Sequence, residues 1–279
     1  MNCKNCKTEL LEQDRYCKNC GGKIIRNRLT FKNIFEHISE TFFNYDNKLL
    51  RTVVHLIKTP EVVIDNYVTG VRKRYVNPIS FFGISLTLTG FSIFIIKKFY
   101  KNVLDVSQYF DVSEIYTNET SQEMMANSAD FSLEYSSLIY ASMIPIFALM
   151  SWVLFLNKRY NYTEHLVTYM YSMSTYSITS VIFGLVVLII APNYYITFGM
   201  SLYVIALFYH CFLLKRLFKT SVKEMILKTL LFLVLLLIVF IILSIISGII
   251  MFIIMMSNGE LDTMIETQKA AAEAAKQVQ

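Results

Sequence analysis

The sequence predicts an all-α integral membrane protein, in which a five-helix transmembrane bundle follows a small N-terminal four-cysteine ribbon and juxtamembrane amphipathic helices. Three observations predict this fold. Hydrophobic residues make up 54% of the 279 residues and charged residues only 17%, the apolar residues cluster into long uncharged runs, and four cysteines lie within the first twenty residues. A soluble core does not need such runs, so the composition excludes an ordinary soluble globule. The predicted segments are the ribbon at 1–28, the juxtamembrane helices at 29–78, the bundle at 79–256 and a polar C-terminal tail at 257–279.

The N-terminal cysteines form two Cys-x-x-Cys pairs, and the sequence Cys-Lys-Asn-Cys occurs in both. Two such pairs joined by a short hairpin can place four thiolates at about 2.3 Å around one tetrahedral zinc ion. A segment this short buries too little apolar surface to fold alone, so the ion would supply most of its folding free energy. Four protein ligands leave no open position, which favours a structural over a catalytic ion. The predicted ligands of one structural Zn²⁺ are Cys3, Cys6, Cys17 and Cys20.

Two alternatives compete with zinc at these cysteines. A pair of disulfides in an exported head conflicts with the cytosolic orientation predicted below. A redox dithiol is typical of a single Cys-x-x-Cys within an α/β domain, and this sequence does not suggest such a domain. Residues 1–28 carry seven Lys and Arg residues against three acids, with Tyr16 as the only aromatic residue. Nucleic-acid binding is therefore not favoured, because a base-stacking surface needs more aromatic side chains, and the basic charge better suits a position beside the membrane.

Residues 29–78 are too polar to span a membrane, but their apolar residues are spaced for three short helices. The first places its apolar residues on one face of 31–42, and Asp46 can cap the second. Thr59 is the expected cap of the third, which has proline at its first position and ends at Gly70. We expect these helices to lie on the inner face of the membrane or on the bundle.

Five uncharged runs are long enough, at about 1.5 Å per residue, to cross or nearly cross a hydrocarbon layer of about 30 Å. Backbone groups in lipid must be satisfied within the segment, so helices are expected. Pro145 is predicted to kink the second span, and the last is long enough to tilt or to bend near Gly248. The expected spans are 79–96, 136–156, 166–190, 194–214 and 229–256. The loop between the first two spans is expected to form a helical cap, and the tail a helix.

The basic residues predict the orientation. Counted by alternating side, 21 of the 26 Lys and Arg residues fall on the side of the N-terminus and 5 on the other. The positive-inside rule then places the N-terminus in the cytosol and the C-terminus outside the inner (cytoplasmic) membrane of a bacterium. No secretory signal is evident near the N-terminus. A basic triplet before the first span, Arg72, Lys73 and Arg74, is a candidate contact with anionic membrane lipid or serves only as a topology anchor.

Hydroxyl residues recur on one face of the third span and also on the first, at Ser85, Thr89 and Ser92. They could line a polar crevice for a small solute or ion, or they could let helices pack closely while bonding to their own backbone. No charged residue lies in the middle of a span, which favours packing, because coupled transporters usually need one. The candidate crevice residues are Thr168, Ser172, Thr175 and Thr179.

Three ionisable residues lie near the cytosolic ends of the third and fourth spans: Glu164, His165 and His210. If those helices are neighbours, the three side chains could form a polar cluster or a second metal site; histidines at helix ends are also common without such a role. Cys211 is either a lipidation site or a small apolar filler. The sequence contains no motif typical of a catalytic centre.

Parts of the sequence resemble a known family. The ribbon, the stretch from Asp46 to Arg72-Lys73-Arg74-Tyr75-Val76-Asn77-Pro78, and the Glu164-His165-Leu166-Val167 sequence resemble an uncharacterised bacterial family. Its members are zinc-ribbon-headed polytopic membrane proteins, classed only as a domain of unknown function. The five-span layout is also loosely similar to the Yip family of membrane-trafficking scaffolds, which is a likeness of fold alone. The resemblance implies the architecture and no activity.

These observations predict a non-enzymatic inner-membrane protein whose cytosolic zinc ribbon recruits or senses a partner, as a scaffold or regulator. The expected partners are membrane lipid, a cytosolic protein bound through the ribbon, and a second copy of the chain. The alternative is a small-solute channel or transporter that uses the hydroxyl-lined helices. A membrane-embedded enzyme built on Glu164, His165 and His210 is a third hypothesis with less support.

Overall fold

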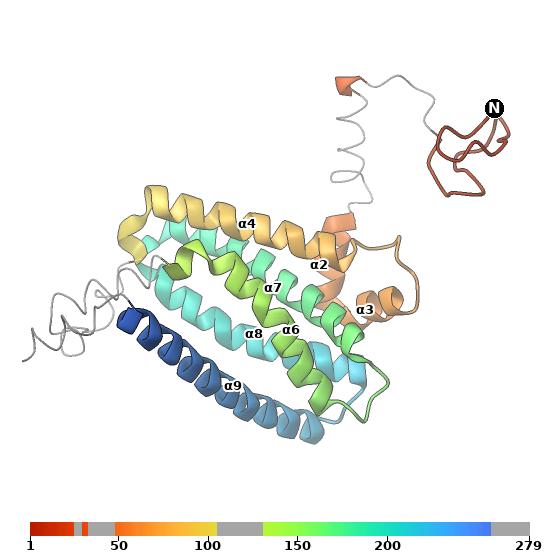
Figure 1. Cartoon of the computed structure of the whole chain (residues 1–279). Coiled ribbons are helices and arrows are strands. Elements are labelled where there is room, and N and C mark those ends of the chain that lie inside the picture. Colours follow the sequence, from red (N-terminus) through yellow and green to blue (C-terminus); the bar gives the residue numbers. More distant parts are fainter. Residues whose placement is uncertain (25–29, 33–47, 105–130, 258–279) are drawn as a thin grey trace, which may run out of the picture. The chain divides into compact units, whose positions relative to one another are not determined.

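The computed structural model describes residues 1–24, 30–32, 48–104 and 131–257 (Figure 1). The chain divides into two compact units, Met1–Arg51 and Thr52–Gln279. The expected first juxtamembrane helix, the Asp46 cap, most of the loop before the second span and the tail fall largely outside the described residues. In the described parts, regular structure is helical apart from two isolated β-bridges near the N-terminus.

The structure describes seven α-helices and two short 3-10 helices from end to end. In chain order they are α2 (Lys48–Lys58), α3 (Pro60–Val68), α4 (Pro78–Phe99), η1 (Lys101–Leu104), α6 (Ser136–Leu154), α7 (Tyr162–Ile190), η3 (Pro192–Tyr194), α8 (Tyr195–Phe218) and α9 (Val222–Ser257).

Five of these helical segments are long and apolar enough to cross a membrane, with mean hydropathies from 1.8 to 3.4. They are α4, α6, α7, η3 with α8, and α9, one for each predicted run. The expectation of an all-helical fold with five helices long and apolar enough to span a membrane is therefore confirmed in the described residues. Successive helices run in opposite directions, so the start of α4 and the 155–161 and 219–221 connections lie at one end of the bundle (Figure 1).

Helix α7 is the centre of the bundle. It contacts α3, α4, α6 and α8, and 39% of its apolar stretch is buried, against none of the corresponding stretch of α9. Tyr171 and Ser174 are fully buried, and Tyr169 packs with Ile144 and Ala148 of α6. Its mean hydropathy does not exceed that of α9, so the difference in burial comes from position and not from composition.

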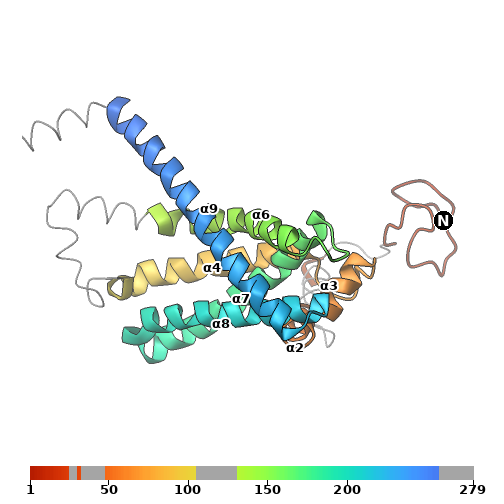
Figure 2. The ribbon, with the colours of Figure 1, turned by 90° about the horizontal axis from the view of Figure 1, so that it is seen from below.

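Helix α9 packs against α6 and α8 and crosses the other long helices obliquely (Figure 2). Its 36 residues span about 54 Å at a rise of 1.5 Å per residue, well beyond a hydrocarbon layer of about 30 Å. It continues as one helix through Gly248, so the oblique course accounts for the excess length. Helix α6 likewise continues through Pro145.

The helices α2 and α3 pack on the end of the bundle that contains the start of α4 and the 155–161 and 219–221 connections. We call this end, where basic residues cluster, the basic end. Leu56, Val63 and Ile64 are fully buried, and the hydroxyl of Tyr209 in α8 donates to the carbonyl of Leu56 at 3.2 Å. The guanidinium of Arg216 donates to the carbonyl of Lys58 at 2.8 Å, capping α2 from α8. Of the two predicted locations, the bundle is therefore the one observed for the part of these helices from Thr52 onward.

The start of α3 corrects one detail of the sequence analysis. Thr59 precedes Pro60 as expected, but its hydroxyl caps no N–H of α3 and instead donates to the carbonyl of His55 at 3.4 Å. Proline already removes one of the unpaired N–H groups at the helix start, so the cap has less to satisfy. Gly70 ends the segment as predicted, with φ of +104°, a conformation that glycine adopts without strain.

Candidate metal centre

The first cysteine pair sits on a tight turn held by backbone hydrogen bonds. The amide of Cys3 donates to the carbonyl of Thr8, and the amide of Lys7 donates back to the carbonyl of Cys3, both at 2.9 Å. Lys7 has φ of +61°, in the left-handed region, and a short antiparallel bridge between Asn2 and Glu9 closes the turn. The turn thus presents two sulfurs from one side of a short loop.

The second pair repeats this turn bond for bond. The amide of Cys17 donates to the carbonyl of Gly22, and the amide of Gly21 donates to the carbonyl of Cys17, again at 2.9 Å. Gly21 occupies the left-handed position with φ of +68°. A methyl group on Gly22 would lie 3.4 Å from Sγ of Cys20, in van der Waals contact with the sulfur. The duplicated sequence therefore forms a duplicated structure, which is the feature expected of a two-knuckle ribbon.

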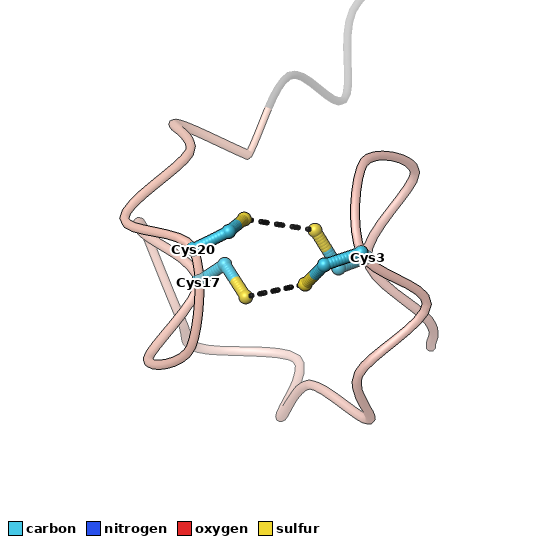
Figure 3. Close-up of side chains that lie close together, drawn as sticks. Cys3, Cys17 and Cys20 are labelled. Carbon is cyan, nitrogen blue, oxygen red and sulfur yellow. Dashed lines mark hydrogen bonds between the residues drawn. The ribbon is translucent and has the colours of Figure 1, made fainter.

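The four sulfurs converge between the two turns (Figure 3). Sγ of Cys3 lies 3.7 Å from Sγ of Cys20, and Sγ of Cys6 lies 3.5 Å from Sγ of Cys17. All four lie within 4.8 Å of one another. Tetrahedral zinc with bonds of about 2.3 Å requires sulfurs about 3.8 Å apart, so the spacing fits a closed four-thiolate ion. In the described residues, no other group of His, Cys, Asp or Glu meets this criterion.

The geometry also separates zinc from a disulfide. All five cysteines of the chain are free, and the sulfur pairs lie far beyond the 2.05 Å of a disulfide bond. The two shortest separations join one knuckle to the other, and all four sulfurs lie within 4.8 Å of one another, as a single shared ion would require.

Hydrogen bonds at the knuckles favour thiolates. The hydroxyl and the amide of Thr8 hold the pKa of Cys6 at about 6, below the usual value for a thiol, and the amide of Gly22 lowers the pKa of Cys20. Backbone amides of Cys20 and Asn19 also favour the thiolate of Cys17, but burial and the nearby sulfurs outweigh them and raise its pKa to about 11. Negative charge on Cys6 and Cys20 therefore disfavours a further thiolate at Cys17. A divalent cation would relieve that repulsion.

A very small core surrounds the sulfurs. Cys3, Leu10 and Cys17 are buried, with Cys6 and Ile24 packed against them, so most of this core consists of candidate ligands. Without an ion the segment has little apolar burial to stabilise it. The residues present fit a structural metal centre.

The hydroxyl stripe of α7 bonds to its own helix. Thr168, Thr175 and Thr179 each donate to the carbonyl four residues earlier, at 2.7–2.8 Å. Ser172 lies 3.4 Å from the carbonyl of Tyr169 in its own helix and 3.1 Å from Nε2 of His210 in α8. Thr168, Ser172 and Thr175 are buried. This arrangement has the form of close helix packing rather than of a hydrated path.

The first span, α4, forms hydrogen bonds with a face of α7 other than the one that carries the hydroxyl stripe. The hydroxyl of Ser85 donates to Ser174 at 3.3 Å, and Thr89 and Ser177 share a hydrogen bond at 2.8 Å. The sequence analysis identified Ser85 and Thr89 but not their partners. Ser174 and Ser177 are three residues apart and therefore share a helix face, which is the signal that could have found them.

The three ionisable residues near the helix ends each have a partner of their own. Glu164 forms a capping box with Asn161 at the start of α7, so its carboxylate accepts a hydrogen bond from the backbone amide of Asn161. Nδ1 of His165 lies 3.0 Å from the Ser151 hydroxyl, while Nδ1 of His210 donates to the carbonyl of Ala206 at 2.9 Å. The group of cysteines remains the one described set with metal-binding spacing.

The basic triplet Arg72, Lys73 and Arg74 is exposed at the end of the bundle. The guanidinium of Arg72 lies 5.4 Å from the centre of the Tyr67 ring, and that of Arg74 lies 5.5 Å from the Tyr75 ring. These rings hold the charged groups in place while leaving them accessible to an anionic surface.

Comparison with known proteins gives one match. A family model described as "Protein of unknown function (DUF3667)" matches residues 46–90, which run from just before α2 to just past the middle of α4. This match fits the resemblance to an uncharacterised family and assigns no activity. No curated protein and no solved structure matches the chain.

Proposed function

We propose that this chain is a non-enzymatic, multi-pass protein of a bacterial inner membrane whose N-terminal ribbon holds one structural zinc ion and recruits or senses a cytosolic partner. The observation that carries the proposal is the convergence of four thiol groups from two matched turns, at the spacing of a closed zinc site. A closed site offers no open coordination position for catalysis, so its role is to shape the surface around it.

The surface of the ribbon suits an acidic protein. Lys4 and Lys18 occupy the same exposed position in the two knuckles, and Lys7 and Lys23 are also exposed. Large apolar side chains lie exposed among these charges, with Leu11 at 63% and Tyr16 at 56%. A basic surface with exposed apolar anchors is typical of binding sites for acidic segments of proteins.

The orientation belongs to the same proposal. A thiolate zinc site needs a reducing compartment, and the excess of basic residues on the side of the N-terminus favours the cytosol. An odd number of spans then carries the C-terminus outside. The bundle supports a structural role, because its buried hydroxyl and imidazole groups largely bond to groups of the protein.

The test uses the full chain in cells. In a Cys17→Ser/Cys20→Ser variant we expect loss of the stoichiometric zinc and of crosslinks between the ribbon and a cytosolic protein, while membrane insertion is retained. Zinc is measured on the purified protein by elemental analysis. Cys211→Ser is the matched control, because it removes a cysteine outside the ribbon and should retain both the zinc and the crosslink.

A charge variant separates recruitment from folding. Lys4→Glu/Lys18→Glu should retain zinc and lose the crosslinked partner, because only the exposed charge changes sign. If the partner binds this variant as well as the wild type, the basic surface is not the binding site. If the cysteine variant also loses insertion, the ribbon serves as internal scaffolding and the recruitment proposal is wrong.

A small-solute channel or transporter is the second candidate, and one cavity favours it. A cavity of about 370 Å³ lies among α4, α6, α7 and α8, with Thr89, Tyr176, Ser177 and Ser180 in its lining. Its lining contains no charged residue and is mostly apolar with several hydroxyl groups, which suits a neutral solute of low polarity. Ser180→Phe should reduce solute flux into reconstituted vesicles, whereas Ile182→Phe, on the exposed side of the same helix, should not. Equal flux through both variants would count against this candidate.

A further inference from the structure

A second cavity lies in the helical unit, closer to the basic end of the bundle. It has a volume of about 380 Å³ and is lined by α6, α7, α8 and α9. Phe147, Tyr169, Leu214 and Phe232 are among the lining residues, and the lining is almost wholly apolar. Its size and composition are typical of a site that encloses a small or chain-like apolar ligand.

The polar groups in this lining are already bonded within the protein. Both ring nitrogens of His210 have partners, and the thiol of Cys211 lies 3.3 Å from the hydroxyl of Thr229. The ammonium of Lys228 donates to the carbonyl of Leu154 at 2.8 Å and to Oδ1 of Asn157 at 2.9 Å. A ligand in the cavity therefore meets hydrocarbon and few free hydrogen-bonding groups, which excludes an ion or a hydrated solute.

The cavity is open to the side, between α8 and α9. Phe155, Leu214 and Met225 in its lining are buried, whereas Tyr203 and Leu207 of α8 and Leu233 of α9 are exposed. Along α9 the lining runs from Met225 to Leu236, about 17 Å of helix at a rise of 1.5 Å per residue. That length is close to half of a hydrocarbon layer of about 30 Å, the depth of one leaflet.

Charge at the basic end of the cavity selects one kind of lipid. Glu224 accepts salt bridges from both Lys158 and Lys228, at 3.6 Å and 3.4 Å, so two ammonium groups face one carboxylate. Lys215 and Lys223, at the neighbouring ends of α8 and α9, are exposed. Clusters of basic residues between transmembrane helices on the cytosolic side are typical contacts for anionic lipid head groups.

We propose that this cavity binds one acyl chain of an anionic phospholipid from the leaflet on the basic side of the membrane. The chain lies between α8 and α9, and the head group lies against the ammonium groups around Lys158. The site is independent of the ribbon and its zinc, because all of its residues belong to the helical unit.

The experiment uses the full chain reconstituted in bilayer nanodiscs with a phosphatidylglycerol that carries a photoreactive group on one acyl chain. We expect adducts concentrated in 203–214 of α8 and 225–236 of α9. Ala206→Phe fills the cavity from α8 and should remove most of these adducts. Val204→Phe is the matched control, because residue 204 is exposed on the same helix and lies outside the lining, and it should leave the adducts unchanged.

A second pair of measurements tests the head group and does not depend on filling the cavity. Unlabelled phosphatidylglycerol should compete for the site better than phosphatidylcholine with the same chains, and Lys158→Gln should reduce that preference. Adducts spread evenly over all lipid-facing helices, or equal adducts in Ala206→Phe and Val204→Phe, would overturn the proposal. A result in which neither α8 nor α9 carries adducts would overturn it too. That result is expected if another segment of this chain or a second copy fills the cavity.

Discussion

The cysteine segment and the helical unit differ in what their interiors are made of. The segment of residues 1–24 buries Cys3, Leu10 and Cys17, two of which are candidate metal ligands. The helical unit buries side chains such as Phe81, Tyr171 and Leu188, which have no role other than packing and hydrogen bonding. Removal of a bound ion should unfold the cysteine segment and leave the packing of the helical unit intact, whereas weaker packing in the helical unit should leave the cysteine site intact. The two kinds of stability are therefore separable by experiment.

Removal of zinc is the largest perturbation expected. Structural zinc sites contribute about 10–16 kcal/mol of apparent binding free energy, which is also folding free energy. A strong chelator should abolish hydrogen-exchange protection of the amides of Lys7 and Gly21, which bond across the two turns, and leave the helical unit protected. Hydrogen exchange read by mass spectrometry on the full chain measures both regions at once. Loss of protection in α7 would show that the two regions are not independent.

A cavity created under α3 by truncating a buried side chain should give the next largest effect on stability. Ile64 is fully buried, and Ile64→Ala should lower the unfolding free energy of the helical unit by about 2–5 kcal/mol. Val62 is exposed on the same helix, and Val62→Ala is the control with an expected change of less than about 0.5 kcal/mol. Denaturant unfolding in mild detergent gives the difference, and zinc content should stay the same in both. Equal effects would contradict the packing of α3 described above.

The contacts of Lys228 that join α9 to the end of α6 should contribute less to the unfolding free energy. The ammonium of Lys228 caps the C-terminus of α6 through the carbonyl of Leu154 and lies 4.1 Å from the centre of the Phe155 ring. Lys228→Met keeps the length of the side chain and should cost about 2 kcal/mol, the range for a hydrogen bond to a charged group. Lys223→Met, at an exposed position five residues earlier, should cost almost nothing in the same unfolding assay.

The smallest effect concerns the hydroxyl contacts within the bundle. A double-mutant cycle of Thr89→Val and Ser177→Ala measures the bond between α4 and α7, and we expect a coupling of about 0.6 kcal/mol. Chevron or equilibrium unfolding of the four proteins supplies the value. A coupling of several kcal/mol would mean that such bonds, and not side-chain packing, hold the spans together.

The five long helices could be predicted because the hydropathy of the sequence shows directly how long each apolar run is. Their ends could not, because the helices continue into charged residues that hydropathy excludes: α7 begins at Tyr162, before Glu164, and α8 continues beyond Lys215 and Arg216 to Phe218. At the start of α7 the Asn161 cap explains the difference, since a capping box stabilises a polar first turn.

The convergence of the four cysteines was predictable from spacing alone, because Cys-x-x-Cys repeats leave few other geometries. Contacts between distant helices were not. The pairing of Ser172 with His210 depends on which helices are neighbours and on how each is rotated. The same holds for Lys228, whose role at the end of α6 requires a partner seventy-four positions away in the chain. A periodic pattern defines a face of a helix but not the helix opposite it.

The central position of α7 has a consequence for how the protein is made. Helix α4 is synthesised first, and the roughly sixty residues between Phe99 and Tyr162 take about 3–13 s to translate at 5–20 residues per second. During that interval Ser85 and Thr89 have left the ribosome while Ser174 and Ser177 do not yet exist. The early spans must wait in the bilayer with only their own backbones as hydrogen-bond partners, and the emergence of α7 sets the moment at which the bundle can assemble.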